Sequence, residues 1–166
     1  MYAGIVIDTN NFTNQTGVRT FEAAAFLRRN GADVVRVRKL FRDDLDDYKA
    51  KAEAVREAEI FEGCFAISTC PSEGIESPTV VGAQAANELL DIAGMKASIV
   101  MTFYNNTIYL SARSIDEVNV QVMMEKLGGG GHRTIAGAQL KDMSLEEARN
   151  RVKEVIRDML EKGDIS

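Results

Sequence analysis

Four successive glycines, Gly128 to Gly131, stand immediately before His132, the only histidine of the chain. Glycine loses more backbone entropy on folding than any other residue, so an ordered run of four needs a reason such as positive φ or the close approach of another molecule. A phosphate group supplies such a reason, because backbone N–H groups of a glycine loop can converge on an anion and the imidazole can add a hydrogen bond. A flexible hairpin or linker is the alternative, since glycine runs commonly have that role.

The residues on either side of the glycine run favour an ordered turn. In residues 118–127 the apolar side chains recur at helical spacing, and residues 136–140 form an apolar segment that predicts the next strand. A tether between domains would not be flanked so closely by two such elements. Asn119 opens the predicted helix, and its side chain suits two roles equally, capping the helix or contacting a ligand.

The composition predicts a globular protein and excludes several classes. The 166 residues are 45% apolar, which is enough for a packed core, and no apolar run approaches the length that spans a membrane. The amino terminus lacks the basic region and cleavage pattern of a secretory signal, so we expect a cytoplasmic location. A net charge of -5 argues against a general nucleic-acid surface, so long nucleic acids are not expected as partners.

The two cysteines and the single histidine limit the metal chemistry. Cys64 and Cys70 lie on one extended segment, where six residues at about 3.3 Å each place them roughly 20 Å apart, beyond disulfide reach. We therefore expect buried free thiols. One histidine and no Cys-x-x-Cys sequence exclude a zinc finger and any histidine-rich metal centre built by this chain alone.

The start of the chain predicts a strand followed by a helix. Residues 3–9 form a short apolar run that contains Asp8 near its end, the pattern of a buried parallel strand with a functional group at its carboxyl end. Residues 19–29 predict a helix that Thr20 caps and Asn30-Gly31 closes.

The middle and the end of the chain predict an α/β unit. The charged residues 42–59 predict a solvated helix that bridges two units, with a boundary near residues 49–57. The following patterns predict, in order, a strand at 63–70, a helix at 79–93, a hairpin of 97–104 and 107–113 joined by Asn105-Asn106, and a final helix that Ser144 and Glu147 open with a capping box.

Two blocks of residues carry a resemblance to a known family. The first block is residues 5–9 with residues 16–24, and the second is Ser111-Ala112-Arg113-Ser114, Asn119-Val120, Gly128 to His132 and Ala136-Gly137-Ala138. Together they resemble the C-terminal part of a DHH-family phosphoesterase with its DHH-associated domain. The second block fits any subgroup, including oligoribonucleases, single-strand exonucleases and the related module of alanyl-tRNA synthetases. The first block looks most like the membrane-anchored bacterial cyclic-di-AMP phosphodiesterases of the GdpP type.

The resemblance implies the fold class and the domain organisation. The class is α/β: a mixed sheet flanked by helices, the DHH-associated substrate-binding domain, preceded by the end of a parallel α/β DHH catalytic domain. Residues 1–48 are then the C-terminal fragment of the catalytic domain, residues 49–62 a linker helix, and residues 63–166 the substrate-binding domain.

The resemblance also implies hydrolysis by two manganese ions, which generate hydroxide and clamp the attacking and leaving oxygens. Only Asp8 falls on a metal-ligand motif of the family, because the Asp-His-His tripeptide and the other upstream ligands are absent. One carboxylate cannot hold two cations near neutral pH. We therefore expect this fragment to hold neither ion alone, to contain no catalytic residue and to lack activity.

Seven substrate-binding residues follow from the second block. The guanidinium of Arg113 fits phosphate bidentately, although a surface arginine at a strand end is the alternative. The imidazole of His132 is expected to contact phosphate or ribose, with a hydrogen-bonded structural histidine as the alternative. The full set is Arg113, Asn119, Gly128, Gly129, Gly130, Gly131 and His132.

The resemblance implies the substrate-binding portion of an enzyme that hydrolyses cyclic-di-AMP to linear 5′-phosphoadenylyl-adenosine. Its partners would be the cyclic dinucleotide and the upstream DHH catalytic domain, in a parent protein anchored to the bacterial membrane. Two alternatives remain: an oligoribonuclease fragment acting on short RNA, and a non-catalytic RNA-binding module. The base preference, a homodimer and any upstream regulatory domains stay open.

Overall fold

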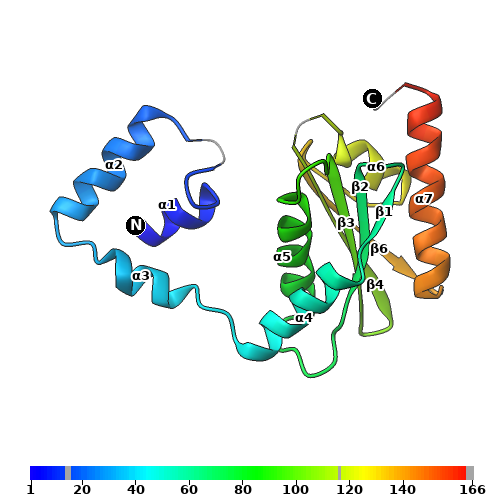
Figure 1. The fold of residues 1–166 in the computed structure, drawn as a ribbon, viewed down its shortest axis with the longest axis horizontal. Helices are drawn as coiled ribbons and strands as arrows, with labels where there is room; N and C mark the ends of the chain where they lie inside the picture. Colours follow the sequence, from blue (N-terminus) through cyan, green and yellow to red (C-terminus); the bar gives the residue numbers. More distant parts are fainter. Residues whose placement is uncertain (14–15, 116, 164–166) are drawn as a thin grey trace. The chain divides into compact units, whose positions relative to one another are not determined.

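The computed structural model describes residues 1–13, 16–115 and 117–163, and Figure 1 shows its elements along the chain. The chain divides into two compact units, residues 1–43 and residues 44–166. The first unit is helical in the described residues and the second is a mixed α/β unit. Each unit is described by itself.

The first unit contains α1 (Tyr2–Asp8), α2 (Val18–Arg29) and α3 (Val34–Leu40). The predicted strand over residues 3–9 is wrong, since these residues form α1. A strand needs neighbours to complete its backbone hydrogen bonds, and the described residues of this unit offer none, whereas a helix satisfies its own. The predicted helix over residues 19–29 is confirmed, but Gly17 occupies the N-cap position predicted for Thr20.

Most apolar side chains of the first unit remain exposed. Among its described residues only Thr9 and Ala24 are buried. Phe21 and Phe26 suit a core by sequence, yet they are 55% and 64% exposed, although Phe21 stacks on Phe12 with ring centroids 5.4 Å apart. Within this unit the three short helices therefore do not enclose a core of their own.

The second unit is built on a six-stranded sheet with the order β1-β2-β3-β4-β6-β5. The pair β2 and β3 is parallel and the other pairs are antiparallel. This mixed sheet with flanking helices is the predicted fold class. The strands are β1 (Glu59–Phe61), β2 (Phe65–Cys70), β3 (Ala97–Tyr104), β4 (Thr107–Ser114), β5 (Gly130–Gly131) and β6 (Ile135–Lys141), and the helices are α4 (Leu45–Arg56), α5 (Pro78–Leu90), α6 (Val120–Lys126) and α7 (Leu145–Glu161).

Helices pack on both faces of this sheet, with α5 on one side and α7 on the other in Figure 1. One core lies between the sheet and helices α6 and α7, and it contains side chains such as Ile99, Leu110 and Ile156. The other lies beneath α4 and α5, where Ala54, Ala85 and Leu89 pack on β2 and β3. Successive side chains of a strand point to opposite faces of the sheet, so neighbouring residues contribute to the two cores in turn.

Local sequence signals explain several elements of this unit. Asn105 and Asn106 have φ values of 47° and 59°, so both adopt the left-handed conformation that a two-residue hairpin turn needs. The predicted hairpin is confirmed. Ser144 and Glu147 form the predicted capping box at the start of α7. Cys64 and Cys70 are free thiols as expected, but only Cys70 is buried, since Cys64 is half-buried. Burial raises the pKa of Cys70 to about 11.

The expected linker differs from the structure. Helix α4 ends at Arg56, and three residues of the predicted linker helix 49–62 form β1 instead. Lys51 on α4 is only 6% exposed and forms an ion pair with Glu88 of α5 at 3.0 Å. The prediction of a solvated helix rested on the charged residues of this stretch. Alanines of α4 are nevertheless buried against the rest of the unit, so α4 is not fully solvated. The division into domains at residues 48 and 62 remains a prediction.

Candidate functional site

The face of the sheet that α5 covers over β2 and β3 continues across β4 and β6, where the side chains are less buried. Along β4 this face presents Tyr109, Ser111 and Arg113, which alternate with the buried Leu110 and Ala112 of the opposite core. We call this surface the open face. It is formed by Tyr109, Ser111 and Arg113 of β4 and by the β6 residues opposite them, Gln139, Gly137 and Ile135. It contains the residues from which a site can be built.

Arg113 lies on the open face and is held by two hydrogen bonds. Its Nε donates to Oδ1 of Asn87 on α5 at 2.8 Å, and its Nη1 donates to the carbonyl oxygen of Ala112 at 2.9 Å. Burial lowers the pKa of Arg113, which stays protonated because arginine titrates far above neutral pH. A guanidinium has five N–H donors, so three remain for a ligand. These two hydrogen bonds thus hold the positive charge of the Arg113 side chain at a defined position on the open face.

Hydrogen bonds of neighbouring residues join the segments that carry Asn119 and His132 to the end of β4, where Arg113 lies. The carbonyl oxygen of Arg133 accepts from the N–H of Val120 at 2.9 Å and lies 3.5 Å from Oγ of Ser114. The hydroxyl of Ser114 donates its proton to the carbonyl oxygen of Val118 at 2.6 Å. These bonds join the end of β4, the start of α6 and the loop that follows the glycines.

Asn119 has the capping role that its position predicts. Its Oδ1 accepts from the N–H groups of Gln121 and Val122, at 3.1 and 3.4 Å, at the start of α6. Contact with a ligand stays a prediction for this residue. The side chain of His132 is exposed, and its backbone N–H donates to the carbonyl oxygen of Ile135 at 2.7 Å.

The first two glycines of the run end helix α6. Gly128 has φ of 80°, its N–H donates to the carbonyl oxygen of Glu125 at 3.0 Å, and the N–H of Gly129 donates to that of Met124 at 2.8 Å. This pair of bonds is the Schellman motif, in which glycine supplies the left-handed residue after the helix. The fold itself therefore requires glycine at position 128.

Close approach to β6 accounts for two further glycine positions. A Cβ at Gly129 would collide with backbone atoms of Gly137 and Ala138, and a Cβ at Gly131 would collide with Ala136. Gly131 also has φ of 148°. At Gly130 a Cβ would meet no atom within 4 Å, and its φ is not positive. Gly130 is the glycine of the run whose missing side chain the fold does not explain.

These bonds change the interpretation of the glycine run as a phosphate cradle. The N–H groups of Gly128, Gly129 and His132 all donate to carbonyl oxygens of the chain, so they do not converge on an anion. Gly130 and Gly131 form the short strand β5, which pairs with β6. The run is ordered, as its flanks indicated, but any role in binding rests on the space above Gly130. Substrate binding by the four glycines stays a prediction.

A pocket of about 390 Å³ opens on the open face beside the glycine run. Backbone of Gly128, Gly129 and Gly137 borders it, and Thr79 at the start of α5 closes one side. The polar side chains in its lining are Thr79, Tyr109, Ser111 and Gln139. Sequence reasoning missed Thr79, Tyr109, Gln139 and the anchoring Asn87. The alternating patterns of β4 and β6 could have indicated that Tyr109 and Gln139 lie on the less buried face. Their pairing could not be predicted, because no local pattern sets the register of the two strands.

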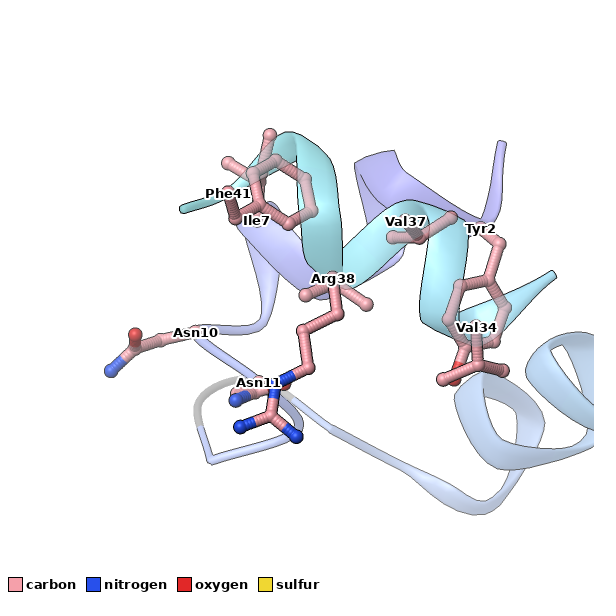
Figure 2. A pocket seen from close by; sticks show the side chains of 9 residues that line it. Tyr2, Ile7, Asn10, Asn11, Val34, Val37, Arg38 and Phe41 are labelled. Atoms are coloured by element: carbon pink, nitrogen blue, oxygen red, sulfur yellow. The ribbon is translucent and has the colours of Figure 1, made fainter. Parts of the chain in front are cut away.

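The first unit contains two further cavities, neither of which includes a predicted substrate-binding residue. Figure 2 shows one of about 650 Å³ between α1 and α3, where apolar side chains such as Val37 and Phe41 stand near Arg38 and Asn11. Asp8 lines the other, of about 590 Å³, together with Arg19 and Glu22 of α2. Asp8 is an exposed residue at the end of α1 rather than at a strand end.

The described residues do not by themselves fit a two-metal centre. Among them, no three His, Cys, Asp or Glu side chains are close enough to hold an ion. A role for Asp8 as a manganese ligand therefore remains a proposal that needs ligands from outside the described residues. In the parts of the chain that the structure describes, no helix is both long and apolar enough to cross a bilayer.

Comparison with known proteins shows the family of this chain. The model of the DHHA1 domain matches residues 63–161. The chain is 44% identical over 164 residues to the cyclic-di-AMP phosphodiesterase GdpP of Geobacillus thermodenitrificans, covering 98% of the chain and 25% of that protein. It is 44% identical over 153 residues to the cyclic-di-AMP phosphodiesterase PdeA of Listeria monocytogenes, covering 92% of the chain and 23% of that protein. It thus corresponds to about a quarter of these relatives, their C-terminal portion.

A solved structure shares the fold at low sequence identity. An exopolyphosphatase-related protein of Bacteroides fragilis superposes with a TM-score of 0.81 at 18% identity, covering 93% of this chain and 48% of that one. This likeness concerns the fold alone. The family model spans more than half of the chain, and the two relatives match nearly all of it. The chain therefore belongs to the DHHA1 domain family of DHH-type phosphoesterases, as its motifs indicate.

Proposed function

We propose that this chain is the substrate-binding portion of a manganese-dependent phosphodiesterase that hydrolyses cyclic-di-AMP to linear 5′-phosphoadenylyl-adenosine. The observation that carries the proposal is the guanidinium of Arg113, which Asn87 holds on the open face with three donors left for a phosphate. Relatives that are 44% identical over almost the whole chain are named cyclic-di-AMP phosphodiesterases, which supports a cyclic dinucleotide as the substrate class.

This chain's own part in the reaction is to bind and orient. Arg113 would take one phosphate, and the exposed imidazole of His132 would contact the same phosphate or the ribose. The absence of a side chain at Gly130 would let the ligand lie close to the β5 backbone. Manganese would supply the hydroxide for hydrolysis, and Asp8 would be one of its ligands alongside residues of the rest of the catalytic domain. We propose that the parent protein is anchored to the cell membrane.

Isothermal titration of this chain tests the proposal against its two alternatives. The ligands are cyclic-di-AMP, its linear product and a short oligoadenylate, with a tRNA end as a fourth, all measured at the same ionic strength because phosphate contacts depend on salt. Tightest binding of cyclic-di-AMP or its product supports the proposal. Preference for the oligoadenylate would favour an oligoribonuclease, and preference for a tRNA end over all three would favour a non-catalytic RNA-binding module. Binding of none would contradict the proposed function.

A further inference from the structure

The pocket beside the glycine run has a lining that is polar but uncharged. Its polar side chains are two hydroxyls, a phenol and a carboxamide, from Thr79, Ser111, Tyr109 and Gln139. None of the four makes a side-chain hydrogen bond to another residue in the described parts of the chain. Polar groups that the fold leaves unpaired in a pocket are available to a ligand.

Tyr109 and Gln139 form a cross-strand pair within this lining. They are directly opposite in the register of β4 and β6, where paired residues have Cβ atoms about 4.5–5.5 Å apart on the same face. A flat aromatic ring therefore stands beside a carboxamide that carries both a donor and an acceptor. A heteroaromatic ligand can stack on the first and exchange two hydrogen bonds with the second.

The floor next to this pair carries only one small side chain. Gly137 lies opposite Ser111 on β4 and opposite Gly130 on β5, so the row of three positions across the sheet has one small side chain and two glycines. The backbone of Gly128 and Gly129 lines the pocket next to this row. A planar ring can approach this backbone closely because no Cβ stands in its way.

The pocket and Arg113 lie along the same face of β4. Tyr109 and Arg113 are four residues apart on the same face of β4, which is about 13 Å along the strand. Ser111 lies between them. A phosphate on Arg113 would therefore leave the attached nucleoside to extend along β4 toward the pocket.

We infer that the pocket of Thr79, Tyr109, Ser111 and Gln139 is a base-binding subsite that takes adenine, an inference that rests on the proposed function. A glutamine amide accepts from N6 of adenine while it donates to N7. Guanine presents two acceptors, O6 and N7, at the same edge and is suited to arginine or lysine, which this lining lacks. Tyr109 supplies the stacking surface, which by itself tolerates any base. Gln139 therefore sets the base preference.

The test compares cyclic-di-AMP with cyclic-di-GMP by isothermal titration of the wild-type chain and three variants. Gln139→Leu is expected to weaken cyclic-di-AMP binding about 5- to 150-fold, the range for one bidentate base contact, and to leave cyclic-di-GMP binding nearly unchanged. Tyr109→Leu should weaken both ligands, because it removes the stacking ring. Gln121→Leu makes the same chemical change on α6, where Gln121 bonds Glu125, and should alter neither affinity.

Failure of this inference is distinguishable from failure of the proposed function by adding Arg113→Ala to the series. If Arg113→Ala weakens both dinucleotides while Gln139→Leu and Tyr109→Leu bind as wild type, phosphate binding stands and the base subsite is wrong. Equal affinity of the wild type for both dinucleotides also overturns the adenine assignment. If the wild type binds neither dinucleotide, the proposed function fails and the base subsite fails with it. Melting temperatures of all variants identify any that are not folded.

Discussion

The Nε atom of Arg113 donates a 2.8 Å hydrogen bond to Oδ1 of Asn87, a residue 26 positions earlier in the chain. Because Nε is occupied by Asn87, the side-on pair of donors formed by Nε and Nη2 is not available to a phosphate. A bidentate contact must then use the end of the guanidinium, through Nη1 and Nη2. Helix α5 thereby sets which edge of the arginine faces the ligand.

Substitutions at Arg113 separate charge from geometry. If the guanidinium binds phosphate bidentately, Arg113→Lys keeps the charge but loses the planar fork, so its affinity for cyclic-di-AMP should fall nearly as far as that of Arg113→Ala. The expected loss is roughly 1.5 to 3 kcal/mol, about ten- to a hundredfold in Kd. Asn87→Ala should cause a smaller loss, because it frees the guanidinium without removing it. Titration calorimetry at low and high salt measures all three. Full rescue by lysine would contradict a bidentate contact.

The glycine run offers a pair of substitutions with opposite expected effects. Gly130→Val adds a side chain into open space at a negative or extended φ, so it should leave the melting temperature nearly unchanged and weaken cyclic-di-AMP binding by blocking close approach. Gly129→Ala should lower the melting temperature, because its Cβ collides with the β6 backbone. Thermal melting of both variants measures the effect on stability, and titration with cyclic-di-AMP measures the effect on binding. A Gly130→Val protein that binds as wild type would remove the glycine run from the site.

Stability should depend on pH through Glu59. A hydrogen bond from Lys153 lowers the pKa of Glu59, at an Nζ to Oε1 distance of 2.7 Å. A carboxyl with a lowered folded pKa contributes stability above its unfolded pKa, about 4.3, and loses it as the pH falls through the folded value. Lys153→Met keeps a long apolar side chain but removes the ammonium, whose Nζ also lies 5.4 Å from the centroid of the Phe61 ring, and should lower the free energy of unfolding at pH 7 by about 0.2 to 1 kcal/mol, the range for an exposed pair.

Urea unfolding at pH 7 and near pH 3 tests the Lys153–Glu59 pair, and the difference between Lys153→Met and the wild type should shrink at the lower pH. Lys49→Met serves as the control, since the Nζ of Lys49 lies 3.6 Å from Oδ1 of Asp46 in an exposed pair. A Lys153→Met defect of the same size at both pH values would show that packing, and not the carboxylate, carries the effect.

Asp8 should matter for turnover and not for binding. In residues 1–166, Asp8→Ala is expected to leave the melting temperature and cyclic-di-AMP affinity unchanged, because Asp8 is exposed at the end of α1. In the longer enzyme the same substitution should abolish manganese-dependent hydrolysis, with Asp46→Ala as a matched exposed aspartate. Hydrolysis is followed by separating cyclic-di-AMP from its linear product. Retained turnover in Asp8→Ala would remove Asp8 from the metal ligands, and turnover by residues 1–166 alone would contradict their expected inactivity.

Local signals explain which elements the sequence predicts well. The Asn105-Asn106 turn and the Ser144–Glu147 capping box depend on residues that are close in the chain, and both occur as predicted. The run at residues 3–9 has no such signal. Its apolar residues suit a buried strand or a short helix, and the choice depends on partners that lie elsewhere in the chain.

The candidate site is less predictable because it is assembled from distant segments. Arg113, Asn119 and His132 could be named from their motif, but the Asn87 anchor and the Tyr109–Gln139 pair depend on helix docking and strand register. The glycines illustrate the same limit. Four in a row indicate that close approach is needed, yet the approaching atoms at Gly129 and Gly131 belong to β6 of the same chain.

The strands at the two edges of the sheet limit how copies of this unit can associate. β1 has three residues and β5 has two, both of them glycines, so neither edge exposes a long row of unpaired backbone groups. Lys153 and Arg157 also lie over the ring of Phe61 at the β1 edge. Extension of the sheet into a second molecule would gain few hydrogen bonds at either side. Any dimer formed through this unit should therefore rest on side-chain contacts, and not on extension of the sheet through β1 or β5.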